Sequence, residues 1–377
     1  MSMSRTYLDY NATAPLLPAA REMMLQAMDA TGNPSSVHGE GRNTRKIVED
    51  AREKVAALAG TNPGNVVFTS GATEANAWAL ARNWDTILLP KIEHDSVLAS
   101  ARSSGAQVID LDVDSNGQLA VGQIPEFASH LSDEKQRRLV TLQMANNETG
   151  SLQPVQEAAR LCREHGLSLH VDAVQAAGRT AIAFDALGAD TLAISSHKIG
   201  GPMGVGALIV RDGLELSSFI VGGGQEKRRR AGTENVPGIA GFGAAAEFVL
   251  GQSQEMARLG QLRDGMERHI ASATPDAVIV GGDGPRIANT SCVAVAGQSS
   301  EILLIKLDLA GIAVSAGSAC SSGKVGASHV LTAMGIKPEL ARGAIRLSLG
   351  WNTSTDDIDT FLRAWSEIVG GQKRAVA

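Results

Sequence analysis

The chain has 377 residues, enough for one large and one small domain, and its 44% hydrophobic and 20% charged residues are typical of a globular protein. A net charge of −6 argues against a general attraction to nucleic acid or to an anionic membrane. Three cysteines are too few for a disulfide framework in a chain of this length, which favours reduced thiols.

Six short apolar segments, separated by helical patterns, lie between about residues 64 and 212. They predict strands at 66–70, 86–90, 138–144, 167–172, 190–196 and 205–210. Buried parallel strands are near-continuous apolar runs, and the connections between them are usually helices. This part of the chain is therefore predicted to form a large α/β domain with a mostly parallel sheet flanked by helices.

After the predicted sheet, the elements follow a different order. A helix is predicted at 238–272, a strand at 289–297, a helix at 300–311 and a strand at 344–350. The first of these helices has possible breaks at Gly251 and Gly260 and is long enough to connect two lobes. The later elements predict a smaller α+β domain. We expect a large domain at 15–255 and a small domain formed by 1–14 and 256–377.

Polar residues cluster directly after the predicted strands, in SGATEAN (70–76), EHD (93–95), ANNETG (145–150), DAVQ (172–175) and SSHKIGGPMGVG (195–206). Ligands of open α/β sheets bind beyond the carboxyl ends of the strands, so one binding site is expected there. In the first cluster, Gly71 and a helix start near Thr73 offer backbone N–H groups to an anion. The alternative is an ordinary helix cap made by Thr73, with Glu74 in the first turn.

Three residues of these clusters suggest a carbonyl cofactor, although each has a simpler explanation. A desolvated Lys198 can form a Schiff base, but a strand-end lysine that reaches solvent fits the pattern equally well. Asp172 ends an apolar strand, where it either pairs with a pyridinium nitrogen or caps a turn. His94 is either a helix cap or an imidazole lying over a ring. Taken together with the anion site, they favour pyridoxal 5'-phosphate (PLP).

Other classes of site match less well. The segment GSACSSGKV (317–325) has five residues between its glycines where a nucleotide P-loop has four, and Val325 stands where that loop has Ser or Thr. No HExxH, paired CxxC or GxGxxG motif is present, and no metal site is expected. The basic run KRRR (227–230) is expected to be a solvated face, and 3% aromatic residues offer little for base stacking.

Nine segments of the chain occur in a familiar order: TYLDYNATAP, GNPSSVHGEGR, FTSGATEAN, NNETG, HVDAVQAAG, SSHKIGGPMGVGAL, GGGQEKRRRAGTENV, SAGSACSSG and IRLSLG. Between about Tyr7 and Trp351, the chain resembles the NifS/IscS-like cysteine desulfurases, in the class V aminotransferase group of PLP enzymes. The resemblance implies the fold of a fold-type I PLP-dependent transferase. One departure is Arg228, where relatives often have glycine.

The resemblance also implies a role for each matching position. Lys198 would form the Schiff base with PLP. The other cofactor contacts would be Asp172 at the pyridine nitrogen, Gln175 at the phenolic oxygen, His94 stacked on the ring, and Ala72, Thr73, Ser195 and His197 at the phosphate. Asn147 would contact cofactor or substrate, and Arg346 would bind the substrate carboxylate. Thr233 would reach the phosphate of the neighbouring subunit, which implies a homodimer with shared sites.

The three cysteines have different surroundings. Cys162 and Cys292 lie in apolar helical and strand patterns and are expected to be small buried hydrophobes. Cys320 has only Ser, Ala and Gly around it, so it is either a chance surface thiol or a nucleophile on a mobile arm. The resemblance favours the second and makes Cys320 the sulfur acceptor, with His94 as a candidate to help deprotonate it.

These observations predict a homodimeric, PLP-dependent cysteine desulfurase that converts L-cysteine to L-alanine and a Cys320 persulfide. The sulfur would pass to an acceptor protein for iron–sulfur cluster or related cofactor assembly. The alternatives are a selenocysteine lyase or related class V aminotransferase, and a non-catalytic sulfur-relay scaffold. A cytoplasmic location is expected, because MSMSRTYLDY lacks the features of a signal peptide and no apolar run approaches the roughly 18 residues of a membrane span.

Overall fold

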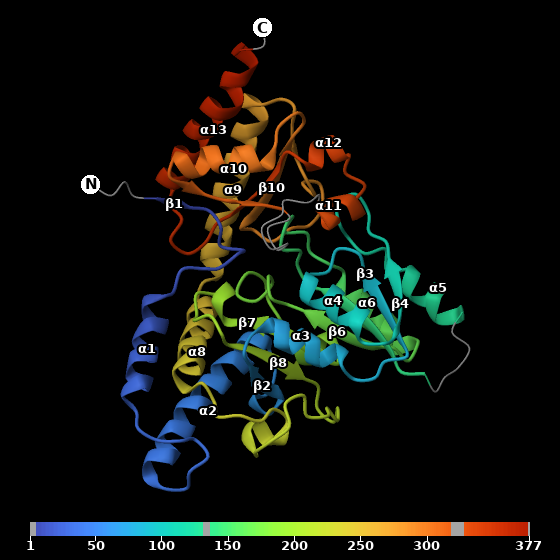
Figure 1. Cartoon of the computed structure of the whole chain (residues 1–377), viewed down its shortest axis with the longest axis vertical. Coiled ribbons are helices and arrows are strands. Elements are labelled where there is room, and N and C mark those ends of the chain that lie inside the picture. The colour runs from blue at the N-terminus through green and yellow to red at the C-terminus, as the bar shows by residue number, and fades with distance from the viewer. Residues whose placement is uncertain (1–4, 131–135, 318–327, 376–377) are drawn as a thin grey trace.

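A computed structural model describes residues 5–130, 136–317 and 328–375. The chain forms two parts, one built on a seven-stranded sheet and the other on a four-stranded sheet (Figure 1). Among the described residues, no helix is long and apolar enough to cross a membrane. The same residues include no group of three or more His, Cys, Asp or Glu side chains that could hold a metal ion.

The seven-stranded sheet confirms the predicted α/β domain. Its order is β2 (Val66–Thr69), β8 (Gly206–Val210), β7 (Thr191–Ser195), β6 (Ser168–Asp172), β5 (Arg138–Gln143), β3 (Thr86–Pro90) and β4 (Gln107–Leu111). Only β8 pairs antiparallel with its neighbours, and all other pairs are parallel. The edge strand β4 was not predicted from the sequence, because its side chains are mostly half-buried or exposed and form no apolar run.

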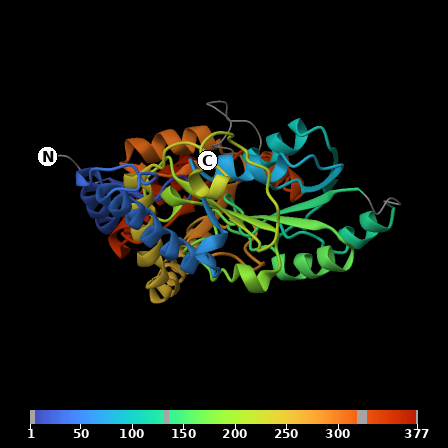
Figure 2. The same cartoon turned by 90° about the horizontal axis from the view of Figure 1, so that it is seen from below.

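Helices cover both faces of this sheet (Figure 2). The helices α3 (Ala72–Leu80) and α4 (Asp95–Ser103) pack on one face, while α6 (Val155–Glu164) and α8 (Val236–Leu250) pack on the other. Successive residues of a strand face opposite sides, so Leu208 joins the hydrophobic cluster of α3 while Ile209 joins the cluster of α8. Burial on both faces explains why most of these strands are rich in apolar residues in the sequence.

The second part is the expected α+β unit. Its antiparallel sheet has the order β12 (Ser315–Ala316), β13 (Ala344–Ser348), β10 (Thr290–Val295) and β9 (Ala277–Ile279). The helices α9 (Ser253–Ala273), α10 (Ser300–Leu309) and α13 (Thr355–Ala375) share a hydrophobic cluster with it. The N-terminal strand β1 (Thr6–Tyr7) pairs with β11 (Ile312–Ala313), so the chain begins in this part. The domain limits of 15–255, and of 1–14 with 256–377, stay a prediction.

The long helical pattern at 238–272 is two helices, since α8 ends at Leu250 and α9 begins at Ser253. Gly251 marks the break, whereas Gly260 lies inside α9. The remaining helices are α1 (Pro18–Asp29), α2 (Gly39–Ala59), α5 (Gln123–His130), α7 (Phe184–Leu187), α11 (His329–Ala333) and α12 (Pro338–Ala341), with short 3-10 helices at Pro63–Asn65, Ser196–Lys198 and Gln225–Arg228. The pairs α1–α8 and α2–α8 pack against each other.

A buried ion pair anchors the turn that precedes Thr233. The guanidinium of Arg52 donates to both carboxylate oxygens of Glu226 at 2.8 Å, and the backbone N–H of Phe68 donates to the same carboxylate at 2.9 Å. Glu226, Lys227 and Arg228 have φ angles of 46°, 56° and 64°, in the left-handed region that favours glycine. This conformation is unfavourable for residues other than glycine, so a strong contact is needed to hold the turn.

We expect Glu226→Ala to lower the free energy of unfolding by up to about 3–5 kcal/mol, because it leaves the buried Arg52 charge with only the half-exposed Glu49 as an acidic partner. Urea denaturation of the variant and the wild type measures the difference. The matched control is Glu164→Ala, which removes a solvent-exposed partner of Arg160 and is expected to change little. Equal stability of the two variants would show that the buried pair does not anchor the turn.

Candidate functional site

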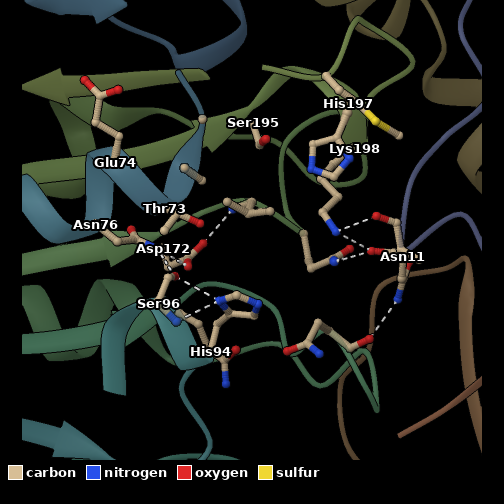
Figure 3. A pocket seen from close by; sticks show the side chains of 18 of the residues that line it. Asn11, Thr73, Glu74, Asn76, His94, Ser96, Asp172, Ser195, His197 and Lys198 are labelled. Atoms are coloured by element: carbon tan, nitrogen blue, oxygen red, sulfur yellow. Dashed lines mark hydrogen bonds between the residues drawn. The ribbon is translucent and has the colours of Figure 1, made fainter. Parts of the chain in front are cut away.

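A cavity of about 530 Å³ lies at the carboxyl ends of the parallel strands (Figure 3). It brings together ten of the predicted site residues: Ala72, Thr73, His94, Asn147, Asp172, Gln175, Ser195, His197, Lys198 and Arg346. Thr233 is exposed and is not among the residues that line the cavity of its own chain. Cys320 lies outside the described residues. The individual roles of all these residues stay predictions.

One end of the cavity is formed by the start of α3. The helix begins at Ala72 after Gly71, and no side chain caps it, so the expected alternative of a Thr73 cap is wrong. The side chain of Glu74 instead accepts a hydrogen bond from the N–H of Ser70 at 2.8 Å. Strand β8 approaches closely here, since a Cβ on Gly206 would lie 2.7 Å from the backbone of Gly71. Because no side chain caps α3, the first backbone N–H groups of the helix are available to bind an anion.

The side chains beside this end add further polar groups. Ser195 ends β7 and His197 follows it, and both line the cavity. The Nδ1 atom of His197 lies 3.2 Å from the hydroxyl of Thr13. Burial, with the charges of Lys198 and Arg179, lowers the pKa of His197 to about 4. At neutral pH this imidazole is therefore an uncharged hydrogen-bonding group.

Lys198 faces the cavity from the segment after β7, where Figure 3 shows its side chain beside Asn11. Its Nζ donates to the carbonyl oxygens of Asn11 at 2.7 Å and Ala12 at 2.9 Å. The amide of Gln175 donates to the same Asn11 carbonyl at 3.0 Å. Sequence reasoning did not assign a role to Asn11 or Ala12, although both lie in the TYLDYNATAP segment that carries the resemblance.

A chain of hydrogen bonds joins Asp172 to His94. Asn76 donates to the carboxylate of Asp172 at 2.8 Å and to the hydroxyl of Ser96 at 3.0 Å. The Nδ1 atom of His94 accepts from the N–H of Ser96 at 3.1 Å and caps α4, so His94 is a helix cap that also lines the cavity. Sequence reasoning missed Asn76, although its position three residues after Thr73 places both on one helix face.

Two buried titratable groups, Glu93 and His170, lie near Asp172, and burial shifts the pKa of each. Burial, followed by the charge of Asp172, raises the pKa of Glu93 well above its usual range. Burial lowers the pKa of His170 to about 4, and its Nε2 lies 2.9 Å from Asn76 Oδ1. Burial therefore disfavours the charged form of both groups, and His170 is uncharged at pH 7.

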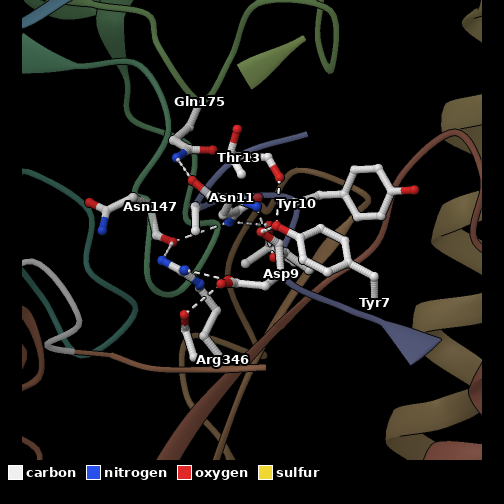
Figure 4. A network of polar contacts seen from close by, with 12 residues as sticks. Tyr7, Asp9, Tyr10, Asn11, Thr13, Asn147, Gln175 and Arg346 are labelled. Atoms are coloured by element: carbon white, nitrogen blue, oxygen red, sulfur yellow. Dashed lines mark hydrogen bonds and ion pairs between the residues drawn. The ribbon is translucent and has the colours of Figure 1, made fainter. Parts of the chain in front are cut away.

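Arg346 reaches the cavity from β13 and is held by two segments distant in sequence (Figure 4). It donates to a carboxylate oxygen of Asp9 at 2.8 Å and to the carbonyl of Asn147 at 3.1 Å. The side chain of Asn11 donates to that carbonyl as well, at 3.1 Å. The Nε atom of Arg346 is buried without a hydrogen-bond partner among the described residues. Sequence reasoning did not identify Asp9 as the partner of Arg346.

Comparisons with known proteins identify the family and the fold of the chain. Residues 6–361 match the family described as aminotransferase class-V. The chain is 39% identical over 375 residues to the cysteine desulfurase IscS of Dictyoglomus turgidum, covering 96% of this chain and 94% of that protein. It is 41% identical over 387 residues to a cysteine desulfurase of Cereibacter sphaeroides, covering 100% and 98%. A solved NifS-like protein from Rickettsia africae ESF-5 has a TM-score of 0.90 at 33% identity, covering 97% of this chain and 99% of that one.

The similarity to the NifS-like structure confirms the expected fold class, a fold-type I PLP-dependent transferase. It extends over 97% of this chain, so it is not confined to one of the two sheets. The family match covers the same elements, from β1 to the first turns of α13. On this evidence, the chain belongs to the aminotransferase class-V family.

Proposed function

We propose that this protein is a PLP-dependent cysteine desulfurase, which moves the sulfur of L-cysteine to Cys320 and releases L-alanine. The relatives named cysteine desulfurase match nearly the whole chain, which supports this activity. The observation that carries the proposal is one cavity lined by the amine of Lys198, the carboxylate of Asp172 and the uncapped start of α3.

The chemistry of these groups fits PLP. The start of α3, with Ser195 and His197, would hold the phosphate, because backbone N–H groups and neutral donors suit an anion. Asp172 would pair with the ring nitrogen, and Lys198 would bind the aldehyde. When bound, PLP supplies an electron sink for the charge that develops at the substrate α-carbon.

Three side chains of the cavity would handle the substrate. The amine of Lys198 would take the α-proton. Because Nδ1 of His94 accepts from the Ser96 N–H, a neutral His94 carries its proton on Nε2 and can donate it or relay it. Arg346 would bind the substrate carboxylate, and its contacts with Asp9 and the Asn147 carbonyl hold it in place before substrate binds.

The sulfur step requires no external oxidant or reductant. The thiolate of Cys320 attacks the substrate sulfur, so that an S–S bond forms while the C–S bond breaks. The bonding pair stays with the substrate carbon, which then takes a proton. L-cysteine and the Cys320 thiol thus give L-alanine and a Cys320 persulfide, and an acceptor protein would collect the persulfide sulfur.

A homodimer with shared sites is part of the proposal. Thr233 is exposed, as expected for a side chain that completes the site of a second copy. The preceding segment exposes Phe219, Ile220 and Val221, with Val221 85% exposed, and such a run of apolar side chains suits an interface. Sedimentation should give twice the chain mass of 39.2 kDa, whereas a stable monomer contradicts the shared site.

The test of the activity is to incubate purified protein with PLP and L-cysteine, to measure alanine and sulfide, and to locate added sulfur by peptide mass. We expect equal amounts of alanine and released sulfur, with added sulfur on Cys320. If the protein releases selenium from selenocysteine but no sulfur from L-cysteine, the result favours a selenocysteine lyase. If it transfers the amino group without releasing sulfur, the result favours an aminotransferase. Protein that binds no PLP would favour a sulfur-relay scaffold.

A further inference from the structure

Arg179 is a partly buried arginine whose hydrogen bonds lead to residues of the cavity and to the segments beside it. Its guanidinium donates to the side-chain oxygen of Gln175, to the Gln175 carbonyl at 3.2 Å, and to the carbonyls of Tyr10 and Lys198, each at 3.4 Å. Gln175 and Lys198 line the cavity, whereas Arg179 borders a separate cavity of about 50 Å³. Arg179 is therefore placed to hold cavity residues without contacting what the cavity binds.

The two ends of the Gln175 side-chain amide have different partners, and each partner can make only one kind of hydrogen bond. The amide oxygen accepts from Arg179, whose guanidinium has donors only. The amide nitrogen donates at 3.0 Å to the carbonyl of Asn11, which is an acceptor only (Figure 4). A reversed amide would set donor against donor at Arg179 and acceptor against acceptor at Asn11. The fold therefore fixes this amide in one orientation.

The fixed orientation decides what Gln175 offers to the cavity. An amide nitrogen has two N–H groups, and the carbonyl of Asn11 accepts from this nitrogen. The other N–H is left for an acceptor in the cavity that Gln175 lines. An electron-rich oxygen at that place would receive a hydrogen bond, whereas a second donor would be rejected.

Arg179 is a charged donor carried on a tight turn. Burial and the positive charge of Arg346 lower its pKa to about 9, so the guanidinium is still protonated at pH 7. The backbone N–H groups of Arg179 and Thr180 both donate to the carbonyl of Ala176, at 2.9 and 3.0 Å. A charged group on so short a turn is suited to holding the amide oxygen of Gln175 in one place.

We propose that Arg179 is a positioning residue that fixes the orientation of the Gln175 amide, so that the cavity receives an N–H donor. The inference rests on the proposed function, because it takes PLP as the occupant and the phenolic oxygen of its ring as the acceptor beside Gln175. That oxygen carries more negative charge once lysine-bound PLP has lost the proton on the Lys198 nitrogen. A hydrogen bond to the oxygen therefore favours the deprotonated form.

The first measurement is a pH titration of the absorption band in the PLP-loaded enzyme, which needs no turnover. We expect Arg179→Met to raise the midpoint by about 0.5–1 pH unit, because the Gln175 amide can then turn its donor away. Arg179→Lys keeps a donor for the amide oxygen, so its midpoint should lie within about 0.3 unit of the wild type. The control is Arg160→Met, which changes a solvent-exposed arginine paired with Glu157 and Glu164 and should leave the midpoint unchanged.

A double variant separates the orientation of Gln175 from a direct effect of the Arg179 charge. Gln175→Ala should raise the midpoint by itself, because it removes the donor. If Arg179 acts through Gln175, adding Arg179→Met to Gln175→Ala should give less than about half of the shift that Arg179→Met gives alone. A larger additional shift would mean that the charge acts on PLP directly, and the inference would be wrong.

A second measurement uses cofactor-free protein that contains nitrogen-15 glutamine. The side-chain amide of Gln175 gives a pair of NMR signals, which are identified by their loss in Gln175→Ala. We expect these protons to exchange with solvent at least about threefold faster in Arg179→Met than in the wild type, because the amide has lost one of its two fixed partners. Arg179→Lys should show the wild-type rate.

The outcomes are distinct. An unchanged midpoint and an unchanged exchange rate in folded Arg179→Met overturn the inference. If the wild type binds PLP but releases no sulfur, the desulfurase activity fails, and the titration still decides the role of Arg179. If the wild type binds no PLP, the proposed function fails, and the exchange rates decide alone. If Arg179→Met does not fold, Arg179→Gln decides by the same measurements, because glutamine can present either a donor or an acceptor to Gln175.

Discussion

Lys198→Ala should abolish alanine formation from L-cysteine, with a rate loss of about 10²–10⁴-fold from the missing proton transfer alone. The variant should also lose the absorption band of lysine-bound PLP, and borohydride should no longer attach the cofactor to the chain. A third effect follows from the contacts of Nζ with Asn11 and Ala12, whose loss should lower the stability of the cofactor-free protein by about 1 kcal/mol per bond.

The matched control for Lys198 is Lys91→Ala. Lys91 is a surface lysine that pairs with Asp112, and its side chain is 43% exposed. This variant should keep the absorption band, the borohydride attachment and the rate of alanine formation. Retained covalent attachment of PLP in Lys198→Ala would mean that another amine binds the aldehyde, and the assignment of the cavity would then be wrong.

Cys320→Ala should reduce sulfur release from L-cysteine to the background level, while the absorption band of lysine-bound PLP remains. Under the proposed function, the substrate would still bind at Arg346 and Lys198, but no thiolate would be available to form the S–S bond. Sulfide and alanine assays, with a spectrum of the same sample, measure both effects. An unchanged rate of sulfur release would assign the chain to a class V enzyme that does not use Cys320.

The other two cysteines are suitable controls for Cys320→Ala. Cys162 and Cys292 are buried, and burial raises the pKa of each thiol to about 12, so neither is ionised at neutral pH. The sequence-based expectation that they are small buried hydrophobes is confirmed. Cys162→Ala and Cys292→Ala should therefore keep the activity and lose only some stability, through the cavities left in the core.

The main elements of the fold follow from local patterns in the sequence. Strands such as β3 and β8 are fully buried, and their sequences TILLP and GALIV are mostly apolar runs that can be recognised without knowing their neighbours. Glycine was only a partial guide to helix ends, because Gly251 marks the break after α8 whereas Gly260 lies inside α9. The edge strand β4 was not recognisable, since its exposed and half-buried residues carry no apolar pattern.

For the site, local patterns and resemblance identified the residues that follow strands, such as Asp172 and Lys198. They did not identify Asn76 as the link between Asp172 and Ser96, because an asparagine in a helix has no periodic signal of its own. The strained turn at Glu226 could not be predicted from the sequence either, because its contact with Arg52 forms only in the folded chain.

By itself, the sequence determined six of the seven strands of the large sheet, the class of fold and the family, because hydrophobic periodicity and motif spacing are properties of residues close together in the chain. The tertiary structure alone decided which distant groups meet. Lys198 bonds the carbonyl of Asn11 across 187 residues, and Ser328 bonds Glu148 across 180 residues. Such contacts depend on the order of strands in the two sheets and on how the N-terminal segment crosses between them, and no pattern within a short stretch of sequence encodes that order.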